Sequence, residues 1–151
     1  MADDNTISVL NKLIETNKDG QEGYKVAAEG IASSSLKSLF YELSQQRSQY
    51  AGELQSLVRE LGGDPETSSS TVGALHRSWI NIKSFVTGKD EAGILAEAER
   101  GEDSAKKAYN DALAENLPAN VQTVVQKQAA EVMKAHDRIR DLTNSADAAT
   151  T

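Results

Sequence analysis

The apolar residues of this chain recur at helical spacing along four long segments, and polar residues interrupt each stripe near its midpoint. In residues 7–31 the positions spaced three and four apart are mostly apolar, but Asn17 and Gln21 break the stripe at its centre. Apolar residues at this spacing share one face of a helix. The pattern therefore predicts four long amphipathic helices around a common core. The other three segments span residues 36–61, 91–116 and 121–142.

The composition favours helices and argues against several kinds of partner and active site. The 151 residues include only two prolines, and Ala, Glu, Gln, Lys and Leu are abundant, which argues against a β-rich fold. The net charge of −7 makes nucleic acid or an anionic membrane a poor partner. The lack of cysteine excludes disulfides, thiolate metal ligands and a cysteine nucleophile. No membrane-spanning run or signal peptide is visible, so a cytoplasmic location is expected.

The links between the segments predict how the helices connect. Short links join the first two and the last two long helices, which makes each pair antiparallel. Between the pairs we expect a loop over residues 62–71 and a shorter helix over residues 72–86, ended by Gly88. This crossover is long enough to make the second and third long helices parallel; the alternative is an up-down bundle with the short helix across one end. One domain over residues 1–145 and a flexible tail at 146–151 are expected.

The polar interruptions would lie at one height in either bundle. Glu102 stands where the third long helix should present an apolar residue, and Arg47 has a similar height on the second. Because a buried carboxylate without a partner is costly, we expect Arg47 to pair with Glu102; an Arg47 that reaches solvent is the alternative. The predicted polar layer comprises Asn17, Gln21, Gln46, Arg47, Glu102 and Gln128.

Five stretches of the sequence carry recognisable motifs, including the patterns DG-x-x-GY, HR-x-W and RGED. They are LNKLIETNKDGQEGYKVAAE (10–29), LVRELGGDPE (57–66), GALHRSW (73–79), ERGEDSAKKAY (99–109) and HDRIRDL (136–142). These stretches resemble an uncharacterised bacterial family of ferritin-like four-helix bundles, distantly similar to rubrerythrin and bacterioferritin. The resemblance implies an all-α, ferritin-like four-helix bundle with a short extra helix in the crossover between helices 2 and 3. It implies no established activity.

The residues present do not predict a standard two-metal site. Ferritin-like proteins use a Glu on each of two helices and Glu-x-x-His on each of the other two, and this chain contains no Glu-x-x-His. The corresponding residues on the second helix, Gln46 and Gln49, are neutral amides and weak ligands for iron or manganese. We therefore expect no cofactor. If Fe or Mn is bound, the candidate ligands are Glu102, Glu131 and His136.

His76, Arg77 and Trp79 form a second candidate, with two interpretations. They could make a binding patch, or His76 and Trp79 could fix the crossover to the bundle. No catalytic residue is predicted, because neither a Ser/His/Asp arrangement nor a phosphate-binding loop is recognisable. The sequence thus predicts a non-enzymatic binding or structural protein with a degenerate metal site. The alternatives are an atypical di-iron or manganese oxidase or storage protein, and a module that assembles into homo-oligomers; no protein partner is identified.

Overall fold

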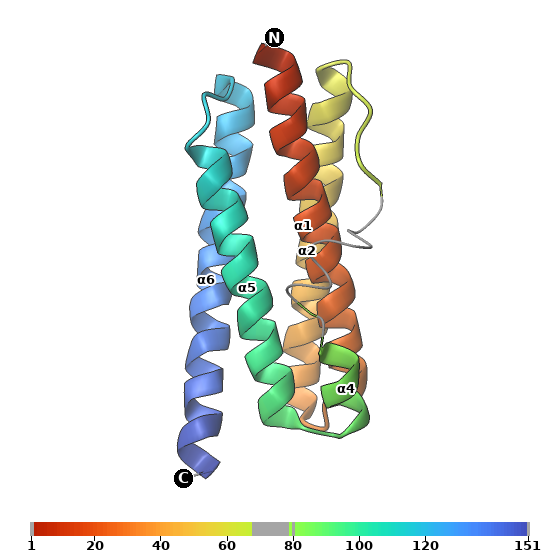
Figure 1. The fold of residues 1–151 in the computed structure, drawn as a ribbon, viewed down its shortest axis with the longest axis vertical. Coiled ribbons are helices and arrows are strands. Elements are labelled where there is room, and N and C mark those ends of the chain that lie inside the picture. Colours follow the sequence, from red (N-terminus) through yellow and green to blue (C-terminus); the bar gives the residue numbers. More distant parts are fainter. Residues whose placement is uncertain (1, 68–78, 80, 151) are drawn as a thin grey trace.

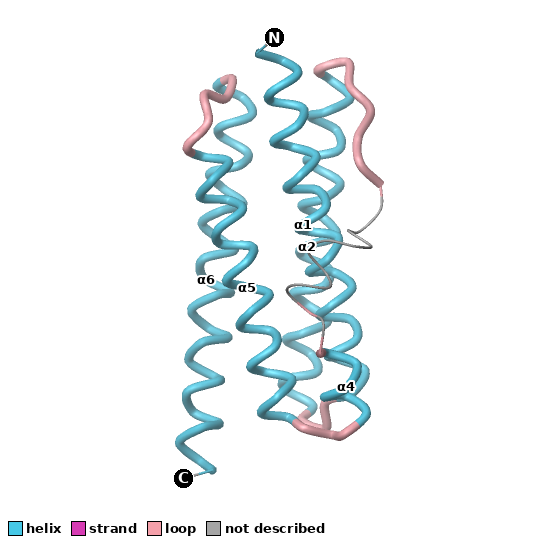
Figure 2. Tube along the Cα trace, viewed as in Figure 1, coloured by secondary structure: helices cyan, strands magenta, loops and turns pink. Residues whose placement is uncertain are grey.

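Four long helices and one short helix make up the part of the chain that the computed structural model describes, residues 2–67, 79 and 81–150 (Figure 1). Figure 2 shows that the described residues are otherwise loops and turns, without a strand. Among these residues, no helix has the length and apolar character needed to cross a membrane. The helices are α1 (Ala2–Gly30), α2 (Ser34–Glu60), α4 (Ile82–Thr87), α5 (Glu91–Leu113) and α6 (Ala119–Thr150).

The order and direction of the helices are those of a ferritin-like bundle. Short links join α1 to α2 and α5 to α6, and each pair is antiparallel. The chain leaves α2 at one end of the bundle and enters α5 at the other, so α2 and α5 are parallel (Figure 1). Gly62, with a φ of 82°, follows the end of α2 in the left-handed conformation that glycine tolerates. The predicted crossover arrangement is confirmed, and the simple up-down alternative is wrong.

Three helix boundaries differ from those predicted. α1 begins at Ala2, ahead of the predicted start at residue 7; the acidic Asp4 suits the first turn because of the helix dipole. α6 continues to Thr150, because its alanine-rich end favours helix, although the flexibility of residues 146–151 stays a prediction. The short helix begins at Ile82 rather than 72, and residues 72–78 lie outside the described part of the chain.

Two buried apolar clusters fill the bundle, one towards each end. One combines the early part of α1 and the late part of α2 with the facing ends of α5 and α6; it includes Leu10, Ile14, Leu54, Val121 and Val125. The other combines the opposite ends of the same helices with the crossover; it includes Tyr24, Phe40, Trp79, Ile94 and Ile139. The polar midpoints of the four stripes lie between the two clusters.

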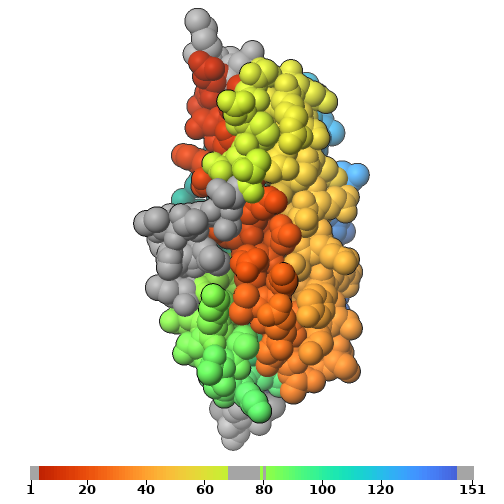
Figure 3. All heavy atoms as spheres, turned by 90° about the vertical axis from the view of Figure 1, so that its right-hand side faces the viewer, coloured from red at the N-terminus to blue at the C-terminus, as the bar shows by residue number. Residues whose placement is uncertain are grey.

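The crossover packs on α1 and α5 through Trp79. Figure 3 shows α1 flanked by the α4 region on one side and α2 on the other. The Trp79 side chain is buried, and a β carbon added to Gly23 of α1 or Gly101 of α5 would overlap its indole ring. The ring also meets Tyr24 edge-on, with centroids 5.0 Å apart. Trp79 of the HR-x-W motif therefore packs against residues of the DG-x-x-GY and RGED motifs.

Gly23→Ala is expected to lower the free energy of unfolding, whereas Gly52→Ala should raise it. Both glycines lie inside helices, where alanine is favoured by roughly 1 kcal/mol. A β carbon at Gly52 meets nothing within 4 Å, but one at Gly23 displaces the Trp79 indole. Urea denaturation followed by fluorescence of the single tryptophan measures both variants. A similar gain at both positions would contradict the close packing of Trp79.

Candidate functional site

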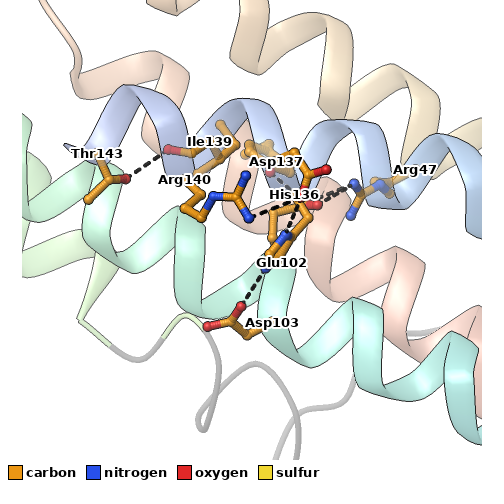
Figure 4. Close-up of polar contacts among 9 residues, drawn as sticks. Arg47, Glu102, Asp103, His136, Asp137, Ile139, Arg140 and Thr143 are labelled. Atoms are coloured by element: carbon orange, nitrogen blue, oxygen red, sulfur yellow. Dashed lines mark hydrogen bonds and ion pairs between the residues drawn. The ribbon is translucent and has the colours of Figure 1, made fainter. Parts of the chain in front are cut away.

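At the centre of the bundle, the Arg47 guanidinium forms an ion pair with the Glu102 carboxylate (Figure 4). Arg47 Nη2 lies 2.7 Å from Glu102 Oε1 and 3.0 Å from Oε2. The two side chains are 2% and 0% exposed. Burial by itself lowers the pKa of Arg47, but the adjacent Glu102 carboxylate outweighs it and raises the pKa above its ordinary value. The pair thus carries no net charge into the core.

Tyr24 and Gln46 complete the surroundings of this pair. The Tyr24 hydroxyl donates to Glu102 Oε1 over 2.6 Å, and its ring centroid lies 5.6 Å from Arg47 Cζ, within the range of a cation–π contact. Burial and then the negative charge of Glu102 raise the pKa of Tyr24 well above its ordinary value, so the phenol stays protonated. Arg47 Nε donates to Gln46 Oε1 over 3.2 Å.

A second hydrogen-bonded chain crosses all four long helices beside the ion pair. Asn17 Nδ2 donates to the Tyr109 hydroxyl, which donates to Gln128 Oε1, both over 2.8 Å. Gln128 Nε2 then donates to the exposed Glu53 carboxylate over 2.9 Å. Burial raises the pKa of Tyr109 far above its ordinary value, so its hydroxyl remains a donor. The chain links the α1 side of the core to the surface between α2 and α6.

The predicted polar layer is only partly the layer that the structure contains. Asn17, Gln46 and Gln128 take part through their side chains, as described above. Gln21 does not: its backbone carbonyl accepts from the Ser44 hydroxyl over 2.8 Å, and its side chain is only half-buried. One helical turn beyond Asn17, it lies on the side of α1 that faces α2. Spacing alone does not resolve this difference in direction, which is why Gln21 was predicted to belong to the layer.

Two tyrosines belong to the layer, although the layer predicted from the sequence did not include them. Tyr24 and Tyr109 each follow a polar interruption of their own helix, Asn17 and Glu102, by seven residues, which is about two helical turns. Such a tyrosine is on the same face as the interruption, and its hydroxyl can reach a polar layer. The signal was present, but it resembles that of an ordinary core tyrosine.

The structure does not bring the three candidate metal ligands together. Glu102 is held by Arg47, whereas Glu131 pairs on α6 with Lys134 over 3.2 Å. His136 contacts two other carboxylates. In the described ranges, no group of three or more His, Asp or Glu side chains could hold a metal ion. A two-metal centre does not fit this donor set, because a buried guanidinium already occupies the central carboxylate.

His136 of α6 joins α5 through Asp103 and also contacts Asp137, its neighbour on α6 (Figure 4). Its Nε2 lies 2.7 Å from Asp103 Oδ1 and its Nδ1 lies 3.1 Å from Asp137 Oδ1. Partial burial lowers the pKa of His136, but the hydrogen bonds to Asp137 and Asp103 raise it more, so the net pKa lies above its ordinary value. The protonated ring can donate to both carboxylates. Asp103 follows Glu102 directly, so this contact fixes α5 beside the ion pair.

Only Trp79 of the second candidate lies within the described residues; His76 and Arg77 lie outside them. Because Trp79 is 3% exposed, its ring packs in the core instead of forming an exposed patch. This position agrees with the interpretation that Trp79 fixes the crossover to the bundle.

Glu102→Ala is expected to lower the free energy of unfolding by about 3–5 kcal/mol, because Arg47 then stays buried without a counterion. The double change Arg47→Met and Glu102→Leu removes both charges at similar volume and should cost less than the single change. Urea denaturation of both variants makes the comparison. A loss below about 1 kcal/mol for Glu102→Ala, the size of an exposed pair, would contradict a compensating role for Glu102.

His136→Gln is expected to destabilise the protein more at low pH than at high pH. The folded-state pKa of His136 is raised, so its stabilising contribution is complete below the unfolded value of about 6.5. That contribution is lost as the pH rises through the folded pKa. Urea denaturation of wild type and variant at about pH 6 and about pH 9 measures the difference. A difference that stays constant or grows with pH would argue against the imidazolium contact.

The fold is similar to that of a solved structure, and the sequence matches one family. A crystal structure of a two-domain protein from Anabaena variabilis, containing DJ-1/ThiJ/PfpI-like and ferritin-like domains, is similar with a TM-score of 0.78 and 15% sequence identity. The match covers 97% of this chain but 41% of that chain, and it shows the ferritin-like fold alone. No curated protein matches the sequence. A family described as a domain of unknown function (DUF2383) matches residues 5–115, and the chain belongs to this family.

Proposed function

We propose that this ferritin-like protein is a non-enzymatic binding or structural protein in which an ion pair stands in place of a metal centre. The observation that carries the proposal is the contact of Arg47 Nη2 with both oxygens of Glu102. A metal ion on the same oxygens would have to displace the guanidinium or lie next to it in a medium of low dielectric, where like charges repel strongly. The site thus disfavours divalent cations.

The remaining polar groups of the layer support the same function. Asn17, Gln46 and Gln128 carry neutral amides, which are weak ligands for iron or manganese. The phenols of Tyr24 and Tyr109 hold their protons and donate to Glu102 and Gln128. These contacts describe a hydrogen-bond network rather than an open coordination sphere, although Asn17 Oδ1 accepts no hydrogen bond among the described residues. A cytoplasmic location and homo-oligomeric assembly stay predictions.

Purified protein incubated without oxygen with Fe(II), Mn(II) or Zn(II), and then desalted, is expected to retain no metal above background by elemental analysis. Arg47→Glu is the matched variant, because it replaces the excluding cation by a second carboxylate next to Glu102. We expect this variant to gain thermal stability when Mn(II) is added, whereas wild type should not.

Two equivalents of iron or manganese retained per wild-type chain, as in a two-metal site, would overturn the proposal. They would favour the alternative of an atypical di-iron or manganese oxidase or storage protein, and would lead to assays of oxygen or peroxide consumption.

A further inference from the structure

A groove runs between α2 and α6, on the side of the bundle away from the α1–α5 contact. It consists of two depressions of about 370 and 160 Å³, which share Glu42 and Gln46 in their walls. The short helix α4 contacts α1 and α5, so it leaves this side uncovered within the described part of the chain. We call the groove and its two walls, formed by residues 39–53 of α2 and 127–138 of α6, the α2/α6 face.

The two walls of this face carry opposite charges. The charged residues of the α2 wall are both acidic, Glu42 and Glu53. Those of the α6 wall are mostly basic and comprise Lys127, Lys134 and Arg138, with Glu131 as the one acid. Among the described residues, Glu131 pairs with Lys134 of its own helix, and no ion pair joins the two walls. The exposed acids of α2 and cations of α6 are therefore available to a partner.

The charges of the two walls lie at matching levels along the bundle. Gln128 of α6 donates to the Glu53 carboxylate of α2 over 2.9 Å, which places its neighbour Lys127 level with Glu53. The two helices are antiparallel (Figure 1), so descending numbers on α2 and ascending numbers on α6 lead in the same direction. Glu42 and Arg138 both lie about 15 Å further along, at 1.5 Å per residue. Each acid of α2 thus has a base of α6 at its own level.

This arrangement makes the face complementary to itself. A twofold axis parallel to the helices keeps the level of every residue and exchanges the two sides of the face, so α2 of one copy lies on α6 of the other. Glu42 then faces Arg138 of the second copy, Glu53 faces Lys127, and each contact occurs twice. An axis across the helices would instead lay α2 on α2, with acid against acid, which is unfavourable.

The size and the remaining charge of the face also suit a second copy. α2 has 27 residues, so the two helices lie beside each other over about 40 Å, with a joint width of about 20 Å. Such a face can bury roughly 800 Å² per chain, the area of a standard-size interface. The acidic Glu131 is level with the neutral amide of Gln49, so the parallel axis brings no carboxylates together.

We propose that the α2/α6 face binds a second copy of this chain about a twofold axis parallel to the helices. An isologous contact requires that one patch complement itself, and the acidic and basic walls at equal levels meet that requirement. Charge complementarity of this kind determines the orientation of the partner. Because the contact uses exposed charges, it does not depend on whether the central site binds a metal, and it goes beyond the proposed function by naming a partner and its surface.

The full chain, analysed by size-exclusion chromatography with light scattering, is expected to show twice the 16.2 kDa mass of one chain. Adding NaCl should weaken the dimer, because salt screens exposed charges. Glu42→Arg and Arg138→Glu should each raise the dissociation constant of the dimer by at least about tenfold, since two contacts between like charges replace two between opposite charges.

A double variant and a matched control locate the contact. Glu42→Arg combined with Arg138→Glu exchanges the two charges, so it should restore the dimer that either single change weakens. Glu22→Arg makes the same change of charge at an exposed position of α1 and should dimerise as wild type does. All three positions are exposed, so these variants are expected to fold.

Three outcomes would overturn the proposal. The wild type could remain a monomer at about 100 µM, well above the micromolar limit of interfaces of this size. Reversal of charge at Glu42 or Arg138 could leave the dimer intact, which would place the contact on another face. The double variant could fail to recover the dimer, which would exclude the facing of α2 by α6. None of these measurements involves a metal, so failure here is distinguishable from failure of the metal-retention experiment.

Discussion

The ion pair between Arg47 and Glu102 is the constraint on which the rest of this bundle depends. Two charges in an apolar core lose their hydration, and their attraction alone seldom compensates that loss. The chain supplies further contacts from other positions: Tyr24 donates to the carboxylate, and Gln46 accepts from the guanidinium. Sliding one long helix by a turn would place an apolar side chain against a charge. We infer that the main effect of the pair is to fix the register of the helices, and that its net contribution to stability is smaller.

The crossover is part of the same unit. Tyr24 contacts Glu102 through its hydroxyl and Trp79 through its ring, so one side chain connects the ion pair to the segment that links α2 with α5. Gly23 and Gly101 each disfavour their helices by roughly 1 kcal/mol relative to alanine. Their small size lets the Trp79 indole enter between α1 and α5. Gly23, Trp79 and Gly101 are far apart in the sequence, but they pack together in the fold.

The sequence predicts this fold well because apolar spacing and link lengths determine which faces are buried and which helices are neighbours. It also predicts the Arg47–Glu102 contact, since both residues interrupt apolar stripes at one height. Spacing predicts the level of a residue along the bundle, but it does not determine the direction in which the side chain points. For that reason Gln21 was placed in the layer, Tyr24 and Tyr109 were missed, and the contact of His136 with Asp103 was not foreseen. Helix ends without strong caps, as in α1 and α6, were also misplaced.

An arginine at the centre of the bundle needs different partners from those that a metal ion needs. A metal ion accepts electron pairs from its ligands, whereas a guanidinium presents five N–H donors and needs acceptors. Glu102 and Gln46 accept from two of its three nitrogens. A guanidinium at the centre of the bundle therefore disfavours a second cation there, and the acceptors that the chain places around it are those that a guanidinium needs.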